Sequence, residues 1–119
     1  MLHKMKLQSS PFEKIKKRLK TIELRLYDEK RQNVKVGDQI EFANLEDRTQ
    51  KLLTRVVALH HFDSFEEMFR VLPAEAMGYS KGQTPKPEDM EQYYSKEEQA
   101  LYGVIGIELA LVDSDEVRL

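Results

Sequence analysis

A short segment near the start of the chain alternates strictly between apolar and polar residues, and it constrains the fold more than any other feature. Within residues 21–27 the apolar side chains stand at every second position: Ile22, Leu24 and Leu26. A period of two is typical of a β-strand that buries one face. The opposite face carries an acid, Glu23, and a base, Arg25. That charged row is either an ordinary solvated face or the floor of a site.

Length and composition favour one modest globular domain. The chain has 119 residues, of which 40% are hydrophobic and 34% are charged, so one domain over residues 1–119 is expected. It contains no cysteine, which excludes disulfides and thiolate sites and favours a cytoplasmic location. No apolar run approaches the roughly 20 residues that a membrane span needs, so we expect no membrane partner. The basic start lacks the apolar stretch of a secretory signal.

Charge is distributed unevenly along the chain. The whole chain has a net charge of −2, but residues 14–35 hold nine cations against three anions, whereas the last third is acidic. This asymmetry predicts one basic face, which is compatible with a phosphate-bearing partner such as RNA. The alternative is that these cations form a solvated helix surface without a partner.

The first helix is expected after a short strand at residues 3–7. Ser10 is a suitable N-cap, Pro11 suits the first helical position, and Glu13 can complete a capping box. Three apolar residues then recur three and four positions apart, as on one face of a helix: Phe12, Ile15 and Leu19.

The remaining elements alternate in a way that favours an α+β domain or a small barrel with helices on its rim. Four further segments are predicted strands: 21–27, 39–45, 52–62 and 103–112. The third is almost continuously apolar and is expected to be buried on both faces over part of its length. A charged loop is expected at 28–38, and helices at 64–72, capped by Ser64, and beyond residue 86, with a new cap at Ser95. Gly106 indicates a bulge or a close approach.

Motifs with a known mechanism are absent from the sequence. It has no phosphate-binding loop, dinucleotide fingerprint or serine elbow. His60 and His61 are adjacent on a predicted strand, so they point to opposite faces, and we expect no metal site and no cofactor. Tyr93 and Tyr94 are able to stack on bases, although one of two such tyrosines on a helix usually belongs to the core.

The charged row of the alternating strand is the best candidate for a site. Alternate strand residues lie about 6.5–7 Å apart, so Glu23 and Arg25 can pair with each other or grip one ligand together. The planar guanidinium of Arg25 suits a phosphate or a base edge, and Glu23 can accept from an exocyclic amine. Lys20 brings a further cation to the same place. The alternative is a solvated salt-bridge ladder that contributes little to stability.

Four blocks of the sequence, in this order, resemble the ASCH domain family, named for activating signal cointegrator homology. They are Lys20-Thr21-Ile22-Glu23-Leu24-Arg25, Leu26 to Phe42, Phe62 to Phe69, and Tyr93 to Leu109. The resemblance implies a PUA-like β-pseudobarrel of about five to six strands with helices packed at its rim. It also implies a cleft between barrel and helices, lined by the row of Lys20, Thr21, Glu23 and Arg25, that binds RNA or a nucleotide-derived ligand.

Enzymes also occur in this family. One bacterial branch is similar over the same segment and hydrolyses N4-acetylcytidine with a lysine, a threonine and a glutamate. Its lysine corresponds to Lys20 and its arginine to Arg25, but its reactive threonine falls on Glu23, which has no hydroxyl nucleophile. Thr21 lies on the same strand face, two residues away, and Glu75 is the nearest counterpart of the acid. The candidate catalytic residues are therefore Lys20, Glu23 and Glu75.

The sequence thus leads to three hypotheses. The first is a binding module for RNA or a nucleoside-type ligand, in which Lys17, Lys30 and Arg31 assist the charged row from the periphery. The second is a hydrolase, acting on an N4-acylcytidine-type nucleoside or as a ribonuclease. The third is a protein-interaction domain in which the charged row is simply solvated. A monomer is expected, although the sequence leaves the oligomeric state open.

Overall fold

The computed structural model describes residues 1–112, and these residues form five strands and five helices. Three residues of the acidic last third lie outside this range: Asp113, Asp115 and Glu116. In chain order the elements are β1 (Leu2–Leu7), α1 (Ser9–Lys16), β2 (Ile22–Leu26), α2 (Glu29–Gln32), β3 (Gln39–Asn44), β4 (Lys51–Phe62), α3 (Phe65–Val71), α4 (Glu88–Glu91), α5 (Lys96–Tyr102) and β5 (Val104–Leu111).

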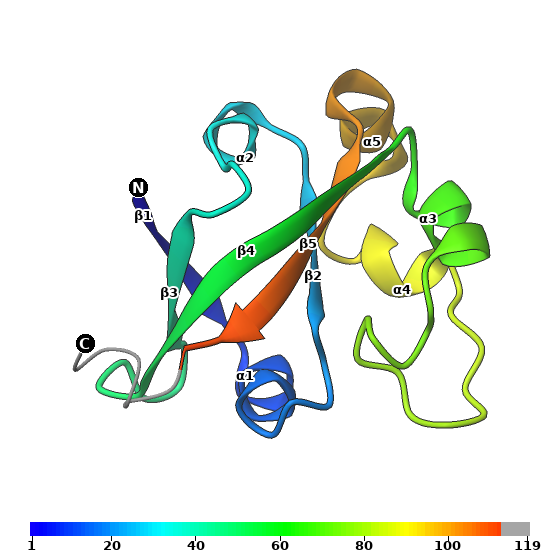
Figure 1. Cartoon of the computed structure of the whole chain (residues 1–119). Coiled ribbons are helices and arrows are strands. Elements are labelled where there is room, and N and C mark those ends of the chain that lie inside the picture. The colour runs from blue at the N-terminus through cyan, green and yellow to red at the C-terminus, as the bar shows by residue number, and fades with distance from the viewer. Residues whose placement is uncertain (113–119) are drawn as a thin grey trace.

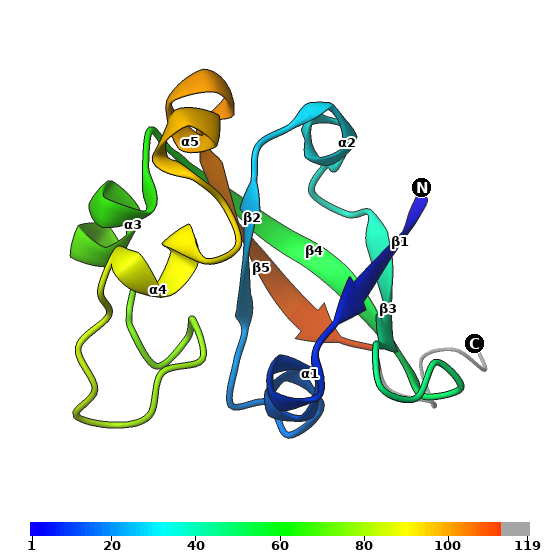
Figure 2. The ribbon, with the colours of Figure 1, turned by 180° about the vertical axis from the view of Figure 1, so that it is seen from behind.

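The five strands form one sheet in the order β1-β3-β4-β5-β2. Only the pair of β1 and β3 is parallel, and the other neighbours are antiparallel. The sheet curls into a half-barrel, with α1 at one end and α2 at the other (Figure 1). Seen from behind, β2 runs between β1 on one side and α4 on the other (Figure 2). This arrangement is the predicted α+β pseudobarrel with helices at its rim.

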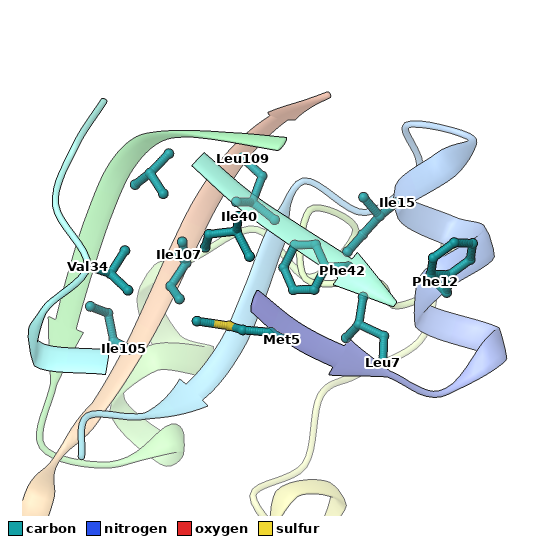
Figure 3. Packing of buried hydrophobic residues seen from close by; sticks show 11 residues of the cluster. Met5, Leu7, Phe12, Ile15, Val34, Ile40, Phe42, Ile105, Ile107 and Leu109 are labelled. Atoms are coloured by element: carbon teal, nitrogen blue, oxygen red, sulfur yellow. The ribbon is translucent and has the colours of Figure 1, made fainter. Parts of the chain in front are cut away.

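Two hydrophobic clusters stabilise the half-barrel. The larger one fills the curl of the sheet and includes Met5 from β1, Phe12 from α1, Phe42 from β3 and Ile107 from β5 (Figure 3). The smaller one joins β2 to α3 and includes Leu24 and Met68. Because the apolar face of β2 packs against α3, its charged face turns toward the inside of the curl.

The prediction that β4 is buried on both faces is wrong. Only Thr54 and Val56 of that strand are buried, while Arg55 and Val57 between and beside them are exposed. The helices instead cover the far face of β5, whose residues from Val104 to Ile107 are all buried. Helix packing, rather than apolar content, therefore determines which strand is buried on both faces.

Gly106 is a point of close approach, as its place in the strand predicted. A Cβ at this position would lie 3.1 Å from Leu72 and 3.2 Å from Ile22, so a glycine lets α3 and β2 pack onto β5. The bulge of this strand pair lies elsewhere, between Val56 and Ala58 of β4.

The predicted start of the first helix is wrong by two residues. The N-cap of α1 is Gln8, and its side chain makes no capping hydrogen bond; the Ser9 hydroxyl donates instead to Asn44. Pro11 still lies in the first turn, where its missing N–H costs nothing. Leu19 does not join the apolar face, because the helix ends at Lys16 and Leu19 remains 64% exposed.

The other predicted caps are present. Ser64 accepts a hydrogen bond from the Glu67 N–H at the start of α3, and Ser95 forms a full capping box with Glu98 at the start of α5. The charged segment 28–38 is not entirely a loop, because Asp28 caps the short helix α2 within it.

Candidate functional site

The structure brings three charged residues of the predicted row together. Glu23 lies between two cations: Lys20 Nζ is 2.9 Å from its Oε1, and Arg25 Nε donates to its Oε2 over 2.8 Å. The exposed fractions of the side chains are only 6% for Glu23, 11% for Lys20 and 12% for Arg25. The row is therefore a buried charged triad and not a solvated ladder.

Arg25 also links β2 to the opposite edge of the half-barrel. Its Nη2 donates to the backbone carbonyl of Lys6 in β1 over 2.8 Å. Since β1 and β2 are the two outer strands of the sheet and do not pair with each other, the guanidinium bridges the gap between them. The same side chain thus helps close the barrel and takes part in the triad.

Burial and charge act in opposite directions on these groups. Burial alone would raise the pKa of Glu23, but the charges of Lys20 and Arg25 and their hydrogen bonds outweigh it and hold the pKa below its ordinary value. Burial likewise acts to lower the pKa of Arg25, and Glu23 together with Tyr94 raises it above the ordinary value. Glu23 and Arg25 are consequently both ionised at neutral pH.

A tight turn after α3 holds Lys20 in place. The carbonyl of Ala76 accepts hydrogen bonds from the N–H groups of Thr21 and Ile22, both over 2.9 Å. Gly78 follows with a φ of +103°, and a Cβ there would lie 3.0 Å from the side chain of Lys20. Lys14 Nζ donates to the Gly78 carbonyl over 2.7 Å. The glycine therefore allows the turn to lie against the aliphatic part of Lys20.

The triad lies in an open cleft of about 830 Å³. Its lining residues come from the β1–α1 junction, β2, the turn at Gly78, and α4 with the segment that follows it. Tyr93 in this wall is 51% exposed, whereas Tyr94 stacks on Phe65 at a ring distance of 5.9 Å. Both tyrosines line the cleft, but Tyr93 is open to a ligand, whereas Tyr94 packs against the smaller cluster and lies beside Arg25.

A third tyrosine, Tyr79, is held in the wall of the cleft by a hydrogen bond. The hydroxyl of Tyr79 donates to Asp89 Oδ2 over 2.8 Å, and this bond ties the turn after α3 to α4. Burial raises the pKa of Tyr79, and the hydrogen bond and charge of Asp89 raise it further. Tyr79 therefore stays protonated and acts as a hydrogen-bonding wall residue.

Several predicted site residues lie outside the cleft. Thr21 and Glu75 are exposed and are not part of its lining. Thr21 follows Lys20 in the chain, and Glu75 precedes Ala76, whose carbonyl accepts a hydrogen bond from the Thr21 N–H. Lys17 is exposed at the end of α1. Lys30 and Arg31 belong to α2 at the opposite end of the half-barrel from α1 (Figure 1), and Arg31 pairs with Asp28 over 2.7 Å.

Lys14 and Tyr79 line the cleft and were not expected there. Neither carries a local sequence signal, because both reach the cleft through contacts between segments that are far apart in the chain. The histidines lie apart from it: His60 Nε2 is 3.0 Å from Glu108, and His61 packs edge-on against Tyr27. Residues 1–112 contain no group of three or more His, Cys, Asp or Glu residues that could hold a metal ion.

Comparisons with known proteins agree with this architecture. The family model of the ASCH domain matches residues 5–113. The chain belongs to the ASCH domain family. The ASCH domain is similar to the crystal structure of hypothetical protein PH0355, with 34% identity and a TM-score of 0.79 over 94% of this chain and 100% of that one.

A second solved structure is equally similar in sequence to this ASCH domain. It is the solution NMR structure of protein PF0455 from Pyrococcus furiosus, with 34% identity and a TM-score of 0.74 over 95% of this chain and 99% of that one. A search among curated proteins found no match. Within residues 1–112, no helix is long and apolar enough to cross a membrane.

Proposed function

We propose that this ASCH domain is a binding module that holds single-stranded RNA or a nucleoside-type ligand in its cleft. The observation that carries the proposal is the buried triad of Lys20, Glu23 and Arg25 on the wall of an open cleft. Taking three charges out of water is costly and seldom stabilises a fold more than apolar packing would. Such an arrangement is better explained by a ligand than by stability alone.

The triad offers hydrogen-bond donors to a ligand in fixed positions. Both oxygens of Glu23 are engaged, so this carboxylate orients the two cations. An ammonium has three donors and a guanidinium has five, and Glu23, Lys6 and Tyr94 use only some of them. The remaining donors of Lys20 and Arg25 suit a phosphate or the acceptor atoms of a base, and exposed Tyr93 suits stacking on the ring.

The composition of the cleft favours binding over covalent hydrolysis. None of the lining residues within the described part of the chain is Ser, Thr, Cys or His. Thr21, which carries the nearest hydroxyl in the row, is exposed outside the lining. A hydrolase with a serine or threonine nucleophile would need that hydroxyl to face the bound ligand.

An NMR titration tests the proposal directly. We would titrate the 15N-labelled domain with uridine, cytidine, N4-acetylcytidine and a short oligouridine, and follow the ligand signals in the same tube. Saturable shifts centred on residues 20–25 are expected, with no conversion of the ligand. Arg25→Lys keeps the charge but loses the planar fork, so it should weaken binding about tenfold. Lys17→Ala should leave nucleoside affinity unchanged.

Two outcomes would contradict the proposal. If no ligand produced saturable shifts at millimolar concentration, the cleft would not be a nucleoside or RNA site. If N4-acetylcytidine were converted to cytidine during the titration, the domain would be a hydrolase. The 15N spectra of Arg25→Lys and Lys17→Ala without ligand show whether each variant keeps the fold.

A further inference from the structure

The backbone register shows that one edge of β2 has no partner strand. Tyr27 N–H donates to the Gly103 carbonyl over 2.9 Å, and Leu109 N–H donates to the Thr21 carbonyl over 2.8 Å. In an antiparallel pair the hydrogen-bonded positions alternate, so the odd-numbered residues of β2 direct their N–H and C=O groups toward β5. Leu24 must therefore direct both of its backbone groups away from β5.

This outer edge of β2 is covered at one end only. The Ile22 N–H donates to the Ala76 carbonyl of the turn after α3. The outward N–H and C=O groups of Leu24 and Leu26 form no hydrogen bond with another described residue. β1 supplies no hydrogen-bond partner to this edge, because it does not pair with β2. The Arg25 side chain spans the gap between the two strands and donates to the outward carbonyl of Lys6.

The outer edge of Leu24 reaches the cleft. Leu24 belongs to the cleft lining, yet its side chain is packed in the cluster between β2 and α3 and the residue is only 6% exposed. Residues from both sides of β2 line the cleft, Glu23 and Arg25 from its charged face and Met77 and Met90 from its apolar side, so the outer backbone edge of Leu24 between them borders the cleft. Leu26, which presents the same unpaired groups one step further along β2, is not part of the lining.

We propose that the backbone N–H and C=O of Leu24 recognise the Watson–Crick edge of an unpaired base. The inference rests on the proposed function and adds the backbone groups that would form hydrogen bonds with the base. Both groups of a strand residue point the same way, so they present a donor beside an acceptor. Each of the four RNA bases carries an acceptor beside a donor on this edge, and this edge is free only in unpaired nucleotides.

A nucleobase fits the edge better than an added peptide strand does. β-strand addition needs a row of unpaired backbone groups, but here the Ala76 turn closes one end and only Leu24 faces the cleft. The cations Lys20 and Arg25 flank the position, and exposed Tyr93 stands in the cleft wall. Cations and an aromatic ring beside a single donor–acceptor pair match a nucleotide.

The test removes the two proposed hydrogen bonds one at a time, the first by changing the base and the second by changing the backbone of Leu24. N3-methyluridine keeps the ring and ribose of uridine but lacks the ring N–H, and we expect it to bind at least tenfold more weakly than uridine. In the full chain, replacing the amide of Leu24 by an ester removes its N–H, and should weaken uridine binding about fivefold. The same ester at Leu26 is the matched control and should leave the affinity unchanged. The Leu24 amide should shift on uridine addition.

The outcomes separate this inference from the proposed function. Equal affinity for uridine and N3-methyluridine, with Arg25→Lys still weakening both, would overturn the role of Leu24 and leave the cleft as a nucleoside site. An affinity loss as large for the Leu26 ester as for the Leu24 ester would also overturn it. A Leu24 shift caused by an extended tetrapeptide and not by uridine would assign the edge to strand addition. If neither uridine nor oligouridine bound, both proposals would fail.

Discussion

Glu23 is the residue on which the charged triad depends. It is the only anion between Lys20 and Arg25, and all three side chains are largely buried. Glu23→Gln keeps the shape but leaves two buried cations without a counter-charge, so we expect the free energy of unfolding at neutral pH to fall by about 3 kcal/mol. Urea unfolding of the two proteins measures this difference.

A surface pair supplies the control for this substitution. Glu41 lies 3.9 Å from Lys51, with side chains 28% and 55% exposed, so Glu41→Gln should cost less than about 1 kcal/mol. Equal stability losses for Glu23→Gln and Glu41→Gln would mean that the triad is solvated and stabilises the fold no more than a surface pair does.

The same residue predicts how stability depends on pH. The pKa of folded Glu23 lies below its ordinary value of 4.5, so the unfolded chain binds this proton more readily. The stabilisation is therefore complete above pH 4.5 and is lost as the pH falls below that value toward the folded pKa. Since glutamine does not titrate, the difference in stability between wild type and Glu23→Gln should shrink over that acidic range. A difference that grew on acidification would contradict the lowered pKa.

At the scale of elements, the turn after α3 determines where Lys20 lies. Gly78 has a φ of +103°, and a Cβ there would meet Lys20 at 3.0 Å; Gly82 has a φ of +86° with nothing within 4 Å. Alanine at either position strains the backbone, so each variant should lose about 1–2 kcal/mol of stability. Only Gly78→Ala should also displace Lys20 and weaken nucleoside binding, by several-fold. Equal affinities for the two variants would show that the turn does not position the triad.

Local sequence patterns predict the helices and strands well, but they do not predict which other elements pack against them. The alternation in β2 and the Ser95 capping box are each contained within a few residues, so the sequence alone predicts them. That the Glu23 face turns inward depends on α3 covering the other face, which no local pattern encodes. The two adjacent tyrosines divide in the same way, because only the contact with Phe65 assigns Tyr94 to the core.

The candidate site follows the same division. Lys20, Glu23 and Arg25 lie on one short segment, so their proximity could be predicted from strand geometry. The place of Lys14 in the cleft could not be predicted, because it depends on a hydrogen bond to Gly78, 64 residues away. The open backbone edge at Leu24 depends on the strand order of the whole sheet, in which β1 pairs with β3 and leaves β2 at the margin.

At the scale of the whole molecule, the cations outside the cleft are separated along the half-barrel. Lys17 lies at the end of α1, near the cleft, and Lys30 lies on α2 at the opposite end (Figure 1). An oligouridine of about four nucleotides, the short end of known single-strand sites, should reach only the first of them. An RNA of about sixteen nucleotides should reach both.

These positions predict how salt weakens RNA binding. Each phosphate neutralised on a single strand contributes about −0.7 to the slope of log affinity against log salt. With the short oligouridine, Lys17→Ala should make the slope less negative by about 0.7 and Lys30→Ala should leave it unchanged; with the longer RNA both variants should flatten it. Uridine carries no phosphate, so its affinity should respond to neither substitution. If Lys30→Ala alone flattened the slope for the short RNA, the strand would bind at the α2 end and not in the cleft beside α1.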